Sequence, residues 1–256
     1  MSDRITALQM YTVRELAGRD MLGTLARVAG IGYRAVEFAG YGGVGLGRLR
    51  SALDEVGLRA IASHVPLGHW RERADEVLEE LHTLGCSYAV APSPPDDVRM
   101  DEQGAWDIAT MLNGCGERCR AAGLRFAYHN HAGEFASAGK ASLWEVMMER
   151  TDPELVEFEL DLYWAEYAGV DPAELLDRHP GRVPLVHVKD MADGPGREDR
   201  PVGEGTLQWD RLLRAAARAG TTGYIVEQDD AVDPLRDSTT SLKNLETMLE
   251  SDRGAG

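Results

Sequence analysis

The feature that most constrains the fold of this chain is the alternation, eight times over, of a short apolar run with a longer amphipathic stretch. This pattern is typical of βα units built around a parallel sheet. The expected strands are residues 5–11, 34–38, 58–64, 88–91, 124–131, 156–161, 183–189 and 224–227. The expected helices are residues 21–29, 47–56, 72–84, 106–122, 143–150, 172–178, 209–219 and 234–250. Eight such units predict an α/β protein with a single (β/α)8 TIM barrel.

The length of the chain and the positions of its glycines support this prediction. A chain of 256 residues suits one barrel domain, which we expect at residues 1–250, followed by a flexible C-terminal tail at residues 251–256. Glycines before the strands are expected to end the preceding helices: Gly32, Gly57, Gly85, Gly123, Gly181 and Gly223. The alternative is an open, doubly wound sheet, but a nucleotide-binding sheet of that kind usually has a glycine-rich turn after its first strand. Residues 9–14 (QMYTVR) stand there instead, which favours the barrel.

Composition limits the partners and the location. The formal net charge of −16 disfavours nucleic acid and anionic lipid. We find no signal-peptide pattern at residues 1–20 and no apolar run long enough for a membrane span, so we expect a cytoplasmic protein with no membrane partner. The three cysteines fit buried packing better than a disulfide or zinc framework.

Polar residues close several of the expected strands, where a barrel carries its active site. The strand ends read VE at 36–37, SH at 63–64, YHNH at 128–131, ELD at 159–161, VHVK at 186–189 and VEQD at 226–229. Because side chains alternate along a strand, His129 shares a face with His131, Glu159 with Asp161, and His187 with Lys189. If those faces point into the barrel, the side chains meet at one place.

A divalent metal is the chemistry that this set favours. Asp161, His187 and Glu227 offer nitrogen and oxygen ligands without thiolate, which suit Mn²⁺, Co²⁺, Zn²⁺ or Mg²⁺. Such an ion can hold a carbonyl and a neighbouring hydroxyl of a sugar and stabilise the enediolate formed when a base removes the intervening proton. Three separate buried ion pairs would incur three desolvation penalties, so the metal site is the preferred interpretation.

Other residues have simpler explanations beside the functional one. Glu37 can pair with Arg34 or Arg14 as readily as it can face the site, and His64 and Asp229 can serve as local hydrogen-bonding or capping groups. Of the last two, only His64 is retained here, with Glu37, as a substrate-binding candidate.

The same motifs resemble the xylose isomerase-like barrel superfamily, which includes sugar phosphate isomerases/epimerases, ketose 3-epimerases and inosose dehydratases. The resemblance spans nearly the whole chain and is carried by residues 128–135 (YHNHAGEF), 159–164 (ELDLYW), 181–190 (GRVPLVHVKD), 202–205 (VGEG) and 224–229 (YIVEQD). It implies a metal bound by a Glu on the fifth strand and by Asp161, His187 and Glu227. His129 stands where that Glu is expected. Either His129 is the fourth ligand or it is the base, and Glu134 is a candidate both for the missing carboxylate and for substrate binding.

The resemblance also extends the list of candidate residues. His129, His131 and Glu227 are candidates for proton transfer. Lys189 can hold an oxyanion or contact substrate, or else pair with Asp190 or Glu159. Trp164 is a candidate wall for a sugar ring, as are Tyr163 and Trp209, against ordinary packing at the barrel mouth.

A loop is expected to cover the site. Residues 192–201 are polar and precede the turn that contains Glu204, so they predict a mobile loop with Glu204 as a substrate-binding candidate. Because a carboxylate there repels phosphate, we expect an unphosphorylated carbohydrate.

Three functions remain open on these grounds. The first is a metal-dependent isomerase or epimerase acting on a sugar, keto-sugar or cyclitol. The second is a lyase that removes the same proton and then expels a β-leaving group, as in inosose dehydration or 3-keto-glycoside elimination. The third is a catalytically inactive sugar-binding barrel. An abasic-site endonuclease of the same superfamily is disfavoured by the net charge. The resemblance also implies a possible homo-oligomer.

Overall fold

Eight parallel strands form a closed barrel in the computed structural model, which describes residues 4–254 and the side chains of residues 4–251. The barrel strands are β1 (Ile5–Gln9), β2 (Ala35–Phe38), β3 (Arg59–His64), β4 (Tyr88–Ala91), β5 (Arg125–His129), β6 (Glu157–Asp161), β7 (Leu185–Val188) and β10 (Gly223–Val226). Each strand pairs with the next along the chain, and β10 pairs with β1 to close the ring. The predicted (β/α)8 barrel is confirmed, and the open sheet is excluded.

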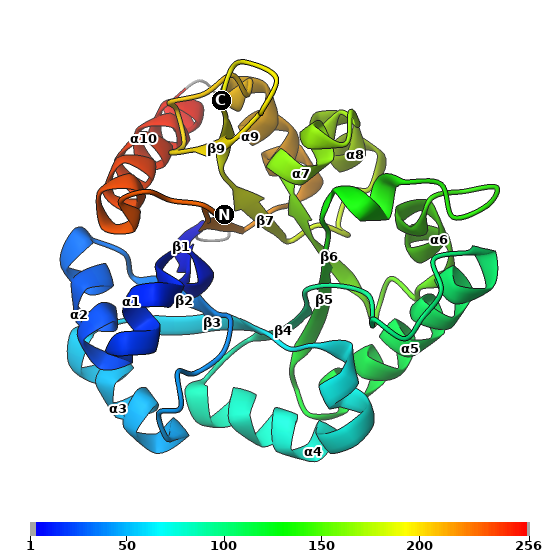
Figure 1. Ribbon diagram of the computed structural model, residues 1–256, viewed down its shortest axis with the longest axis horizontal. Coiled ribbons are helices and arrows are strands. Elements are labelled where there is room, and N and C mark those ends of the chain that lie inside the picture. Colours follow the sequence, from blue (N-terminus) through cyan, green and yellow to red (C-terminus); the bar gives the residue numbers. More distant parts are fainter. Residues whose placement is uncertain (1–3, 255–256) are drawn as a thin grey trace.

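Helices surround the barrel on all sides (Figure 1). They are α1 (Arg14–Arg19), α2 (Met21–Ile31), α3 (Leu46–Val56), α4 (Leu67–Leu84), α5 (Glu102–Ala121), α6 (Leu143–Arg150), α7 (Leu162–Tyr167), α8 (Pro172–Arg178), α9 (Trp209–Ala219) and α10 (Pro234–Gly254). Two 3-10 helices, η1 (Met10–Val13) and η2 (Ala132–Phe135), follow β1 and β5, and a short antiparallel pair, β8 (Asp190–Met191) with β9 (Asp199–Arg200), follows β7.

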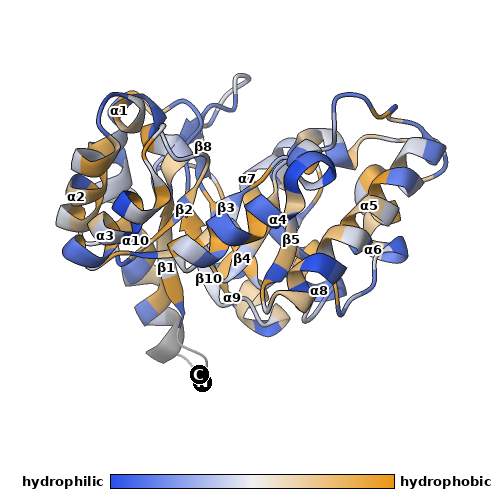
Figure 2. Cartoon of the chain, turned by 90° about the horizontal axis from the view of Figure 1, so that it is seen from below, coloured by the Kyte–Doolittle hydropathy of each residue, from blue (hydrophilic) through white to orange (hydrophobic). Residues whose placement is uncertain are grey.

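The outer helices pack one apolar face against the sheet, as their sequence spacing requires. Helix α9 buries Trp209, Leu212, Leu213 and Ala216, which recur at intervals of three or four residues and therefore lie on one face. In Figure 2 the strands are mainly orange, whereas the helices carry blue and orange residues together. The major hydrophobic core therefore lies between the sheet and the helices.

A smaller apolar cluster fills the inside of the barrel. Its buried members are Ala7, Ala35, Ile61, Ala62, Tyr88, Val90, Ala127, Leu185 and Ile225. Most of these side chains are small, so they close the lumen beneath the polar residues at the strand ends. The barrel interior is a packed layer with the site above it.

Several of the predicted boundaries were wrong, and two of them bear on the site. Gly220, with a φ of 88°, caps α9, whereas Gly223 is the first residue of β10. Strand β5 ends at His129 and not at residue 131, because His131 is extended but precedes η2 and donates its backbone N–H to Glu134. Polar residues after a strand remain extended without joining the sheet, which is why sequence pattern overstates the strands.

The last helix and the chain ends concern the predicted domain boundary, and the lengths of the helices concern the predicted absence of a membrane span. The domain boundary expected at residue 250 falls inside α10, which meets no helix-breaking residue before Gly254. Residues 1–3 and 255–256 of the predicted segments lie outside the described residues. Within the described part of the chain, no helix is both long and apolar enough to cross a membrane. The cytoplasmic location and the homo-oligomer stay predictions.

Candidate metal centre and adjoining pocket

The strand register brings the predicted metal ligands together. His129 at the end of β5 pairs with Glu159 on β6, and Asp161 at the end of β6 pairs with His187 on β7. Glu227 follows the last residue of β10, the strand that pairs with β7. Because the carboxyl ends of parallel strands meet at one mouth of the barrel, residues far apart in sequence become neighbours.

Four of these residues form a compact donor set. One ligand atom from each of His129, Asp161, His187 and Glu227 lies within 4.8 Å of the others, and all four residues are buried. These are the four residues predicted as metal ligands. The arrangement offers two imidazoles and two carboxylates to a single divalent cation.

The His187 ring lies between two groups of carboxylates. Its Nδ1 lies 2.9 Å from Glu227 Oε2 and 4.0 Å from Asp161 Oδ2. Its Nε2 lies 2.8 Å from Glu37 Oε2 and 3.1 Å from Glu159 Oε2. The two ring nitrogens therefore contact different carboxylates, and His187 lies between the two groups.

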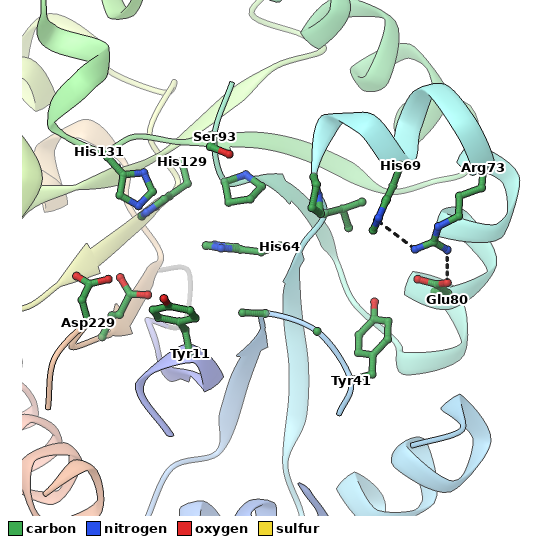
Figure 3. Close-up of a pocket in the computed structure, with 16 residues that line it drawn as sticks. Tyr11, Tyr41, His64, His69, Arg73, Glu80, Ser93, His129, His131 and Asp229 are labelled. Carbon is green, nitrogen blue, oxygen red and sulfur yellow. Dashed lines mark hydrogen bonds and ion pairs between the residues drawn. The ribbon is translucent and has the colours of Figure 1, made fainter. Parts of the chain in front are cut away.

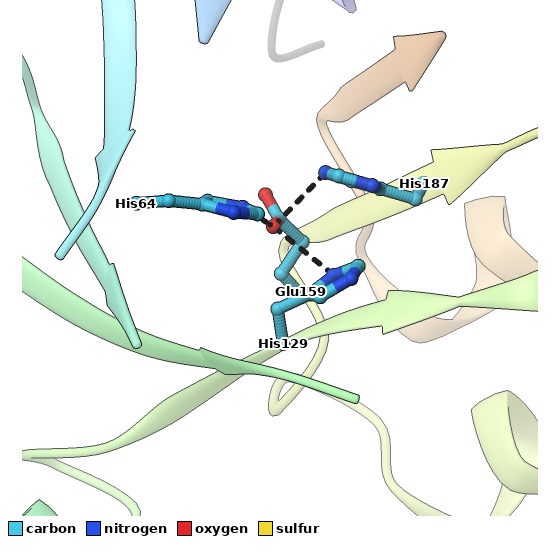
Figure 4. A group of neighbouring side chains, drawn as sticks. All are labelled: His64, His129, Glu159 and His187. Atoms are coloured by element: carbon cyan, nitrogen blue, oxygen red, sulfur yellow. Dashed lines mark hydrogen bonds and ion pairs between the residues drawn. The ribbon is translucent and has the colours of Figure 1, made fainter. Parts of the chain in front are cut away.

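A second donor set overlaps the first on the Nε2 side of His187. It consists of His64, His129, Glu159 and His187, whose ligand atoms also lie within 4.8 Å of one another (Figure 4). Glu159 is the centre of this set: its Oε2 lies 3.0 Å from His64 Nε2 and 3.4 Å from His129 Nδ1. Sequence reasoning missed Glu159 as a site residue, although its position two residues before Asp161 on the same strand face was the available signal.

Lys189 supplies the positive charge on the other side. Its Nζ is fully buried and lies 3.0 Å from Asp161 Oδ2, 2.6 Å from Glu227 Oε2 and 2.6 Å from Asp229 Oδ2. The pairings with Asp190 or Glu159 that sequence allowed are not formed among the described contacts. Instead, Asp190 accepts hydrogen bonds from Trp209 Nε1 and from the backbone of Gly203 and Leu207, so Trp209 is a packing residue.

Burial and charge together set the protonation of the cluster. Burial lowers the pKa of His187, but Glu159 and Glu227 outweigh it and raise this pKa well above its usual value. Burial and the neighbouring His187 hold the pKa of His129 well below its usual value. Burial raises the pKa of Asp161 to about 6, against the lowering effect of Lys189. Burial raises the pKa of Glu227, but Lys189 and His187 reverse the effect and leave it well below its usual value.

The donor chemistry fits a divalent cation. Among the described side chains, His129 Nδ1 and Asp161 Oδ2 are buried and make no hydrogen bond, although the first lies 3.4 Å from Glu159 Oε2 and the second has its ion pair with Lys189. A cation can use the lone pairs of both atoms. Imidazole nitrogen and carboxylate oxygen are the donors that Mn²⁺, Co²⁺ and Zn²⁺ take in open sites.

Several other candidates lie close by. Glu37 is fully buried, and its Oε2 accepts a hydrogen bond from Gln9 Nε2 at 2.9 Å and faces His187, so the alternative pairing with Arg34 or Arg14 is not formed in the described structure. The Asn130 side chain accepts the backbone N–H of Asp161 at 3.0 Å, which fixes that ligand in place. Gln9 and Asn130 were not found from the sequence, because neither residue type marks a site by itself.

Two candidates have other roles. Glu134 accepts hydrogen bonds from the Tyr128 hydroxyl and from the backbone of His131, both at 2.8 Å, so its two oxygens are occupied in capping η2. It does not supply the missing carboxylate. Glu204 is exposed in the turn after β9 and does not line the pocket described below, so the argument that it repels phosphate was wrong.

The segment that was expected to cover the site makes hydrogen bonds to α7. Arg197 donates to the backbone carbonyls of Glu166 and Tyr167, at 2.8 and 3.0 Å, and its own carbonyl accepts the Tyr163 hydroxyl at 2.7 Å. Arg197 therefore attaches this segment to α7, and the mobility of the segment stays a prediction. Trp164 on α7 lies with its ring 5.7 Å from that of His131 and does not line the pocket itself.

A pocket of about 540 Å³ opens beside the metal ligands. Figure 3 shows its two ends: His64, His129, His131, Tyr11 and Asp229 lie together at one, and four side chains from α4 and the loop after β2 lie at the other. Glu227 also lines it, so two predicted ligands, His129 and Glu227, belong to both the donor set and the pocket wall. Burial lowers the pKa of His131. The inner end of the pocket thus offers a neutral imidazole and a carboxylate to a bound molecule.

A comparison of sequences identifies the family. The model of the xylose isomerase-like TIM barrel matches residues 25–246. This chain belongs to that family. The resemblance drawn from the strand-end motifs is therefore confirmed.

Curated proteins with similar sequences include inosose dehydratases. An inosose dehydratase from Geobacillus kaustophilus (strain HTA426) is 29% identical over 189 residues, which are 65% of this chain and 61% of that protein. An inosose dehydratase from Lacticaseibacillus casei is 25% identical over 173 residues, which are 59% of this chain and 57% of that protein. The matches thus extend over about three fifths of the length of these relatives.

Solved structures match over more of the chain. A sugar phosphate isomerase/epimerase from Parabacteroides distasonis ATCC 8503 has a TM-score of 0.84 and 26% identity, and the match covers 96% of this chain and 94% of that one. The IOLI protein with a bound zinc atom has a TM-score of 0.75 at 16% identity, covering 98% and 99% of the two chains. The second likeness concerns the fold.

Proposed function

We propose that this chain is a divalent-metal-dependent enzyme that transfers a proton next to the carbonyl of a sugar, keto-sugar or cyclitol, as an isomerase or epimerase. The observation that carries the proposal is the buried donor set of His129, Asp161, His187 and Glu227 beside an open pocket at the carboxyl ends of the strands. The names of the relatives in sugar isomerisation and inosose dehydration support the substrate class.

A bound cation such as Mn²⁺, Co²⁺, Zn²⁺ or Mg²⁺ would polarise the carbonyl and stabilise the enediolate. The protein's part is to hold the ligands and to fix their charge. Asn130 orients Asp161 through its backbone, and Lys189 neutralises Asp161 and Glu227 from behind. Because both supports are buried, the ligands are held before substrate arrives.

We assign proton transfer to two of the groups that line the pocket, His131 and Glu227. His131 is kept neutral by burial, so it can accept a proton at neutral pH. Glu227 is kept ionised by Lys189 and His187, so it can accept one from the other side of a bound ring. In these states both groups are bases, so one of them removes the proton from the carbon and, once protonated, returns it as the acid.

His129 is better suited to ligand than to base in this proposal. It is buried and its low pKa keeps the imidazole neutral, which is the form that binds metal. The chain therefore has one carboxylate and one imidazole where the epimerase pattern has two glutamates.

That difference favours a second candidate, a lyase. After the same proton is removed, the bond from the β-carbon to its oxygen breaks, and the leaving group takes up a proton and departs as water or an alcohol. His131 could return the proton it received. The curated relatives named inosose dehydratase support this alternative.

The test is turnover in deuterated water after metal removal and reloading. The protein is stripped with a chelator, reloaded with each of the four ions and incubated with ketoses, 3-keto-glycosides and inososes. An epimerase gives a product of unchanged formula that carries deuterium from solvent, whereas a lyase gives a product that has lost water or an alcohol. No turnover, with a metal content that Asp161→Ala does not change, would overturn both and leave a catalytically inactive sugar-binding barrel.

A further inference from the structure

The pocket continues well beyond the residues that the proposed chemistry uses. Its volume of about 540 Å³ lies within the range of about 300–1,000 Å³ that is typical of sites for drug-sized ligands, which are larger than one hexose. The inner end is formed by strand ends, and the outer end by Tyr41, His69, Arg73 and Glu80 (Figure 3). A single sugar at the inner end leaves the outer end in contact with water alone.

At the outer end of the pocket, helix α4 is interrupted. Arg73 has a φ of −148° and a ψ of 44°, so the helix is broken there into two segments. Its guanidinium lies between them, 3.1 Å from His69 Nδ1 and 2.5 Å from Glu80 Oε1. These three side chains follow the spacing i, i+4 and i+11, so α4 carries them on one face, and the contacts of Arg73 hold them together across the break.

The charge of this end argues against an anionic occupant. Arg73 is paired with Glu80 and lies 3.8 Å from Glu76, so its positive charge is already compensated. The other acidic residues on the pocket wall are Glu227 and Asp229, at the inner end. A phosphate or carboxylate would find no free cation among the lining residues, whereas hydroxyl groups would find donors and acceptors at once.

The shape of the outer wall suits a ring. Tyr41 is half-buried, its ring stands edge-on to Phe38 with centroids 5.7 Å apart, and its hydroxyl lies 3.2 Å from Ser63 Oγ. Both contacts fix the ring while part of it stays open to the pocket. Aromatic faces pack against the C–H face of a sugar, and His69 and Glu80 can bond the hydroxyls at its rim. His64, Val65, Pro66 and His69 all line the pocket, so its wall is continuous from the end of β3 to α4.

We propose that Tyr41, His69, Arg73 and Glu80 form a subsite for a second, uncharged ring, so that the preferred substrate is a two-ring carbohydrate, a disaccharide or glycoside. This inference rests on the proposed function for the chemistry at the inner end. It narrows the substrate class from single sugars and cyclitols to molecules in which the reacting ring carries another.

The experiment compares a one-ring and a two-ring keto-sugar, 3-keto-glucose and 3-keto-maltose, as substrates of the metal-loaded enzyme. We expect kcat/KM to be about ten-fold or more higher for the two-ring sugar, since one stacked ring and its hydrogen bonds are worth about 1–2 kcal/mol. In Tyr41→Ala and His69→Ala the preference for two rings should fall about ten-fold. His82→Ala is the matched control: it removes an exposed imidazole from the same helix, away from the pocket, and should keep the wild-type preference.

The outcomes separate the subsite from the chemistry. Equal kcat/KM for both sugars, unchanged in Tyr41→Ala, would overturn the subsite and leave the proposed function standing. No turnover of either sugar would count against the proposed function, and calorimetric titration would then decide the subsite. Tighter binding of 3-keto-maltose that Tyr41→Ala abolishes would support it, and equal binding of both sugars would overturn it.

Discussion

Two neighbouring layers inside the barrel are built on the same strands yet have opposite character. The lower layer includes Leu185 on β7 and Ile225 on β10, in a wholly apolar cluster. Two residues further along each strand, His187 and Glu227 belong to the buried charged layer. Because alternate residues of a strand share a face, the side chains of both layers point into the barrel, and the layers differ in whether those side chains are apolar or charged.

The comparison separates what stabilises the barrel from what makes the site. Burial of the lower layer contributes apolar contacts without any need for partners. The upper layer buries carboxylates, imidazoles and Lys189, and each charge needs a partner because an isolated buried charge costs several kcal/mol. Damage to the lower layer should therefore change stability first, and damage to the upper layer should change metal binding and turnover first.

The largest effect is expected from Glu227→Gln in the upper layer. The amide can still fill the space but can no longer accept a proton, so kcat should fall by about 10² to 10⁴. Steady-state kinetics on the metal-loaded protein measure this. Asp230→Asn, three residues on and 93% exposed, is the control and should keep wild-type kcat. A folded, metal-loaded Glu227→Gln with unchanged kcat would remove Glu227 from the proposed chemistry.

Lys189→Met tests the charge balance of the same layer. It leaves Asp161 and Glu227 without their buried cation, so the metal-free protein should lose about 3–5 kcal/mol of unfolding free energy. Added metal should restore part of that stability, because it binds the same carboxylates in the folded state. Chemical denaturation with and without Mn²⁺ measures both. Lys140→Met, at an exposed position, should change little, and an equally small loss in Lys189→Met would contradict the account.

Leu185→Ala probes the lower layer. This side chain is 3% exposed, and its truncation should cost about 2–5 kcal/mol of unfolding free energy. At a temperature where the variant is folded, its metal content and kcat should stay near wild type. Val232→Ala, at a position 96% exposed, should cost no more than about 0.5 kcal/mol. Loss of metal from folded Leu185→Ala would show that the layers are not separable.

The smallest effect is a pH dependence of metal affinity. His187, whose pKa is raised by Glu159 and Glu227 against the effect of burial, carries a proton at neutral pH that the metal must displace. Asp161, with its pKa raised by burial to about 6, takes up another as the pH falls through that value. Affinity should therefore rise with pH, by up to about ten-fold per unit for each displaced proton, and more steeply below about pH 6. Mn²⁺ titrations at several pH values measure it, and a flat profile would rule out His187 as a ligand.

The sequence predicted the barrel because its periodicity is strong in every unit, and it predicted the four-residue donor set because strand ends of a barrel converge. It did not predict Glu159, whose carboxylate joins His64 to His129, since nothing in a single strand tells which of two inward residues lies deeper. It misplaced Glu204, because a turn gives no direction for its side chain. Helical spacing places residues 69, 73 and 80 on one face of α4, but the sequence did not show that this face lines a pocket or that the helix breaks at Arg73.

The most direct test of the central claim is anomalous diffraction from crystals grown with Mn²⁺ or Zn²⁺. The account predicts one strong peak at about 2.0–2.3 Å from ligand atoms of His129, Asp161, His187 and Glu227, on the Nδ1 side of the His187 ring. A peak on the opposite side, among His64, His129 and Glu159, would contradict the assigned ligand set, and no peak at either place would contradict the metal centre itself.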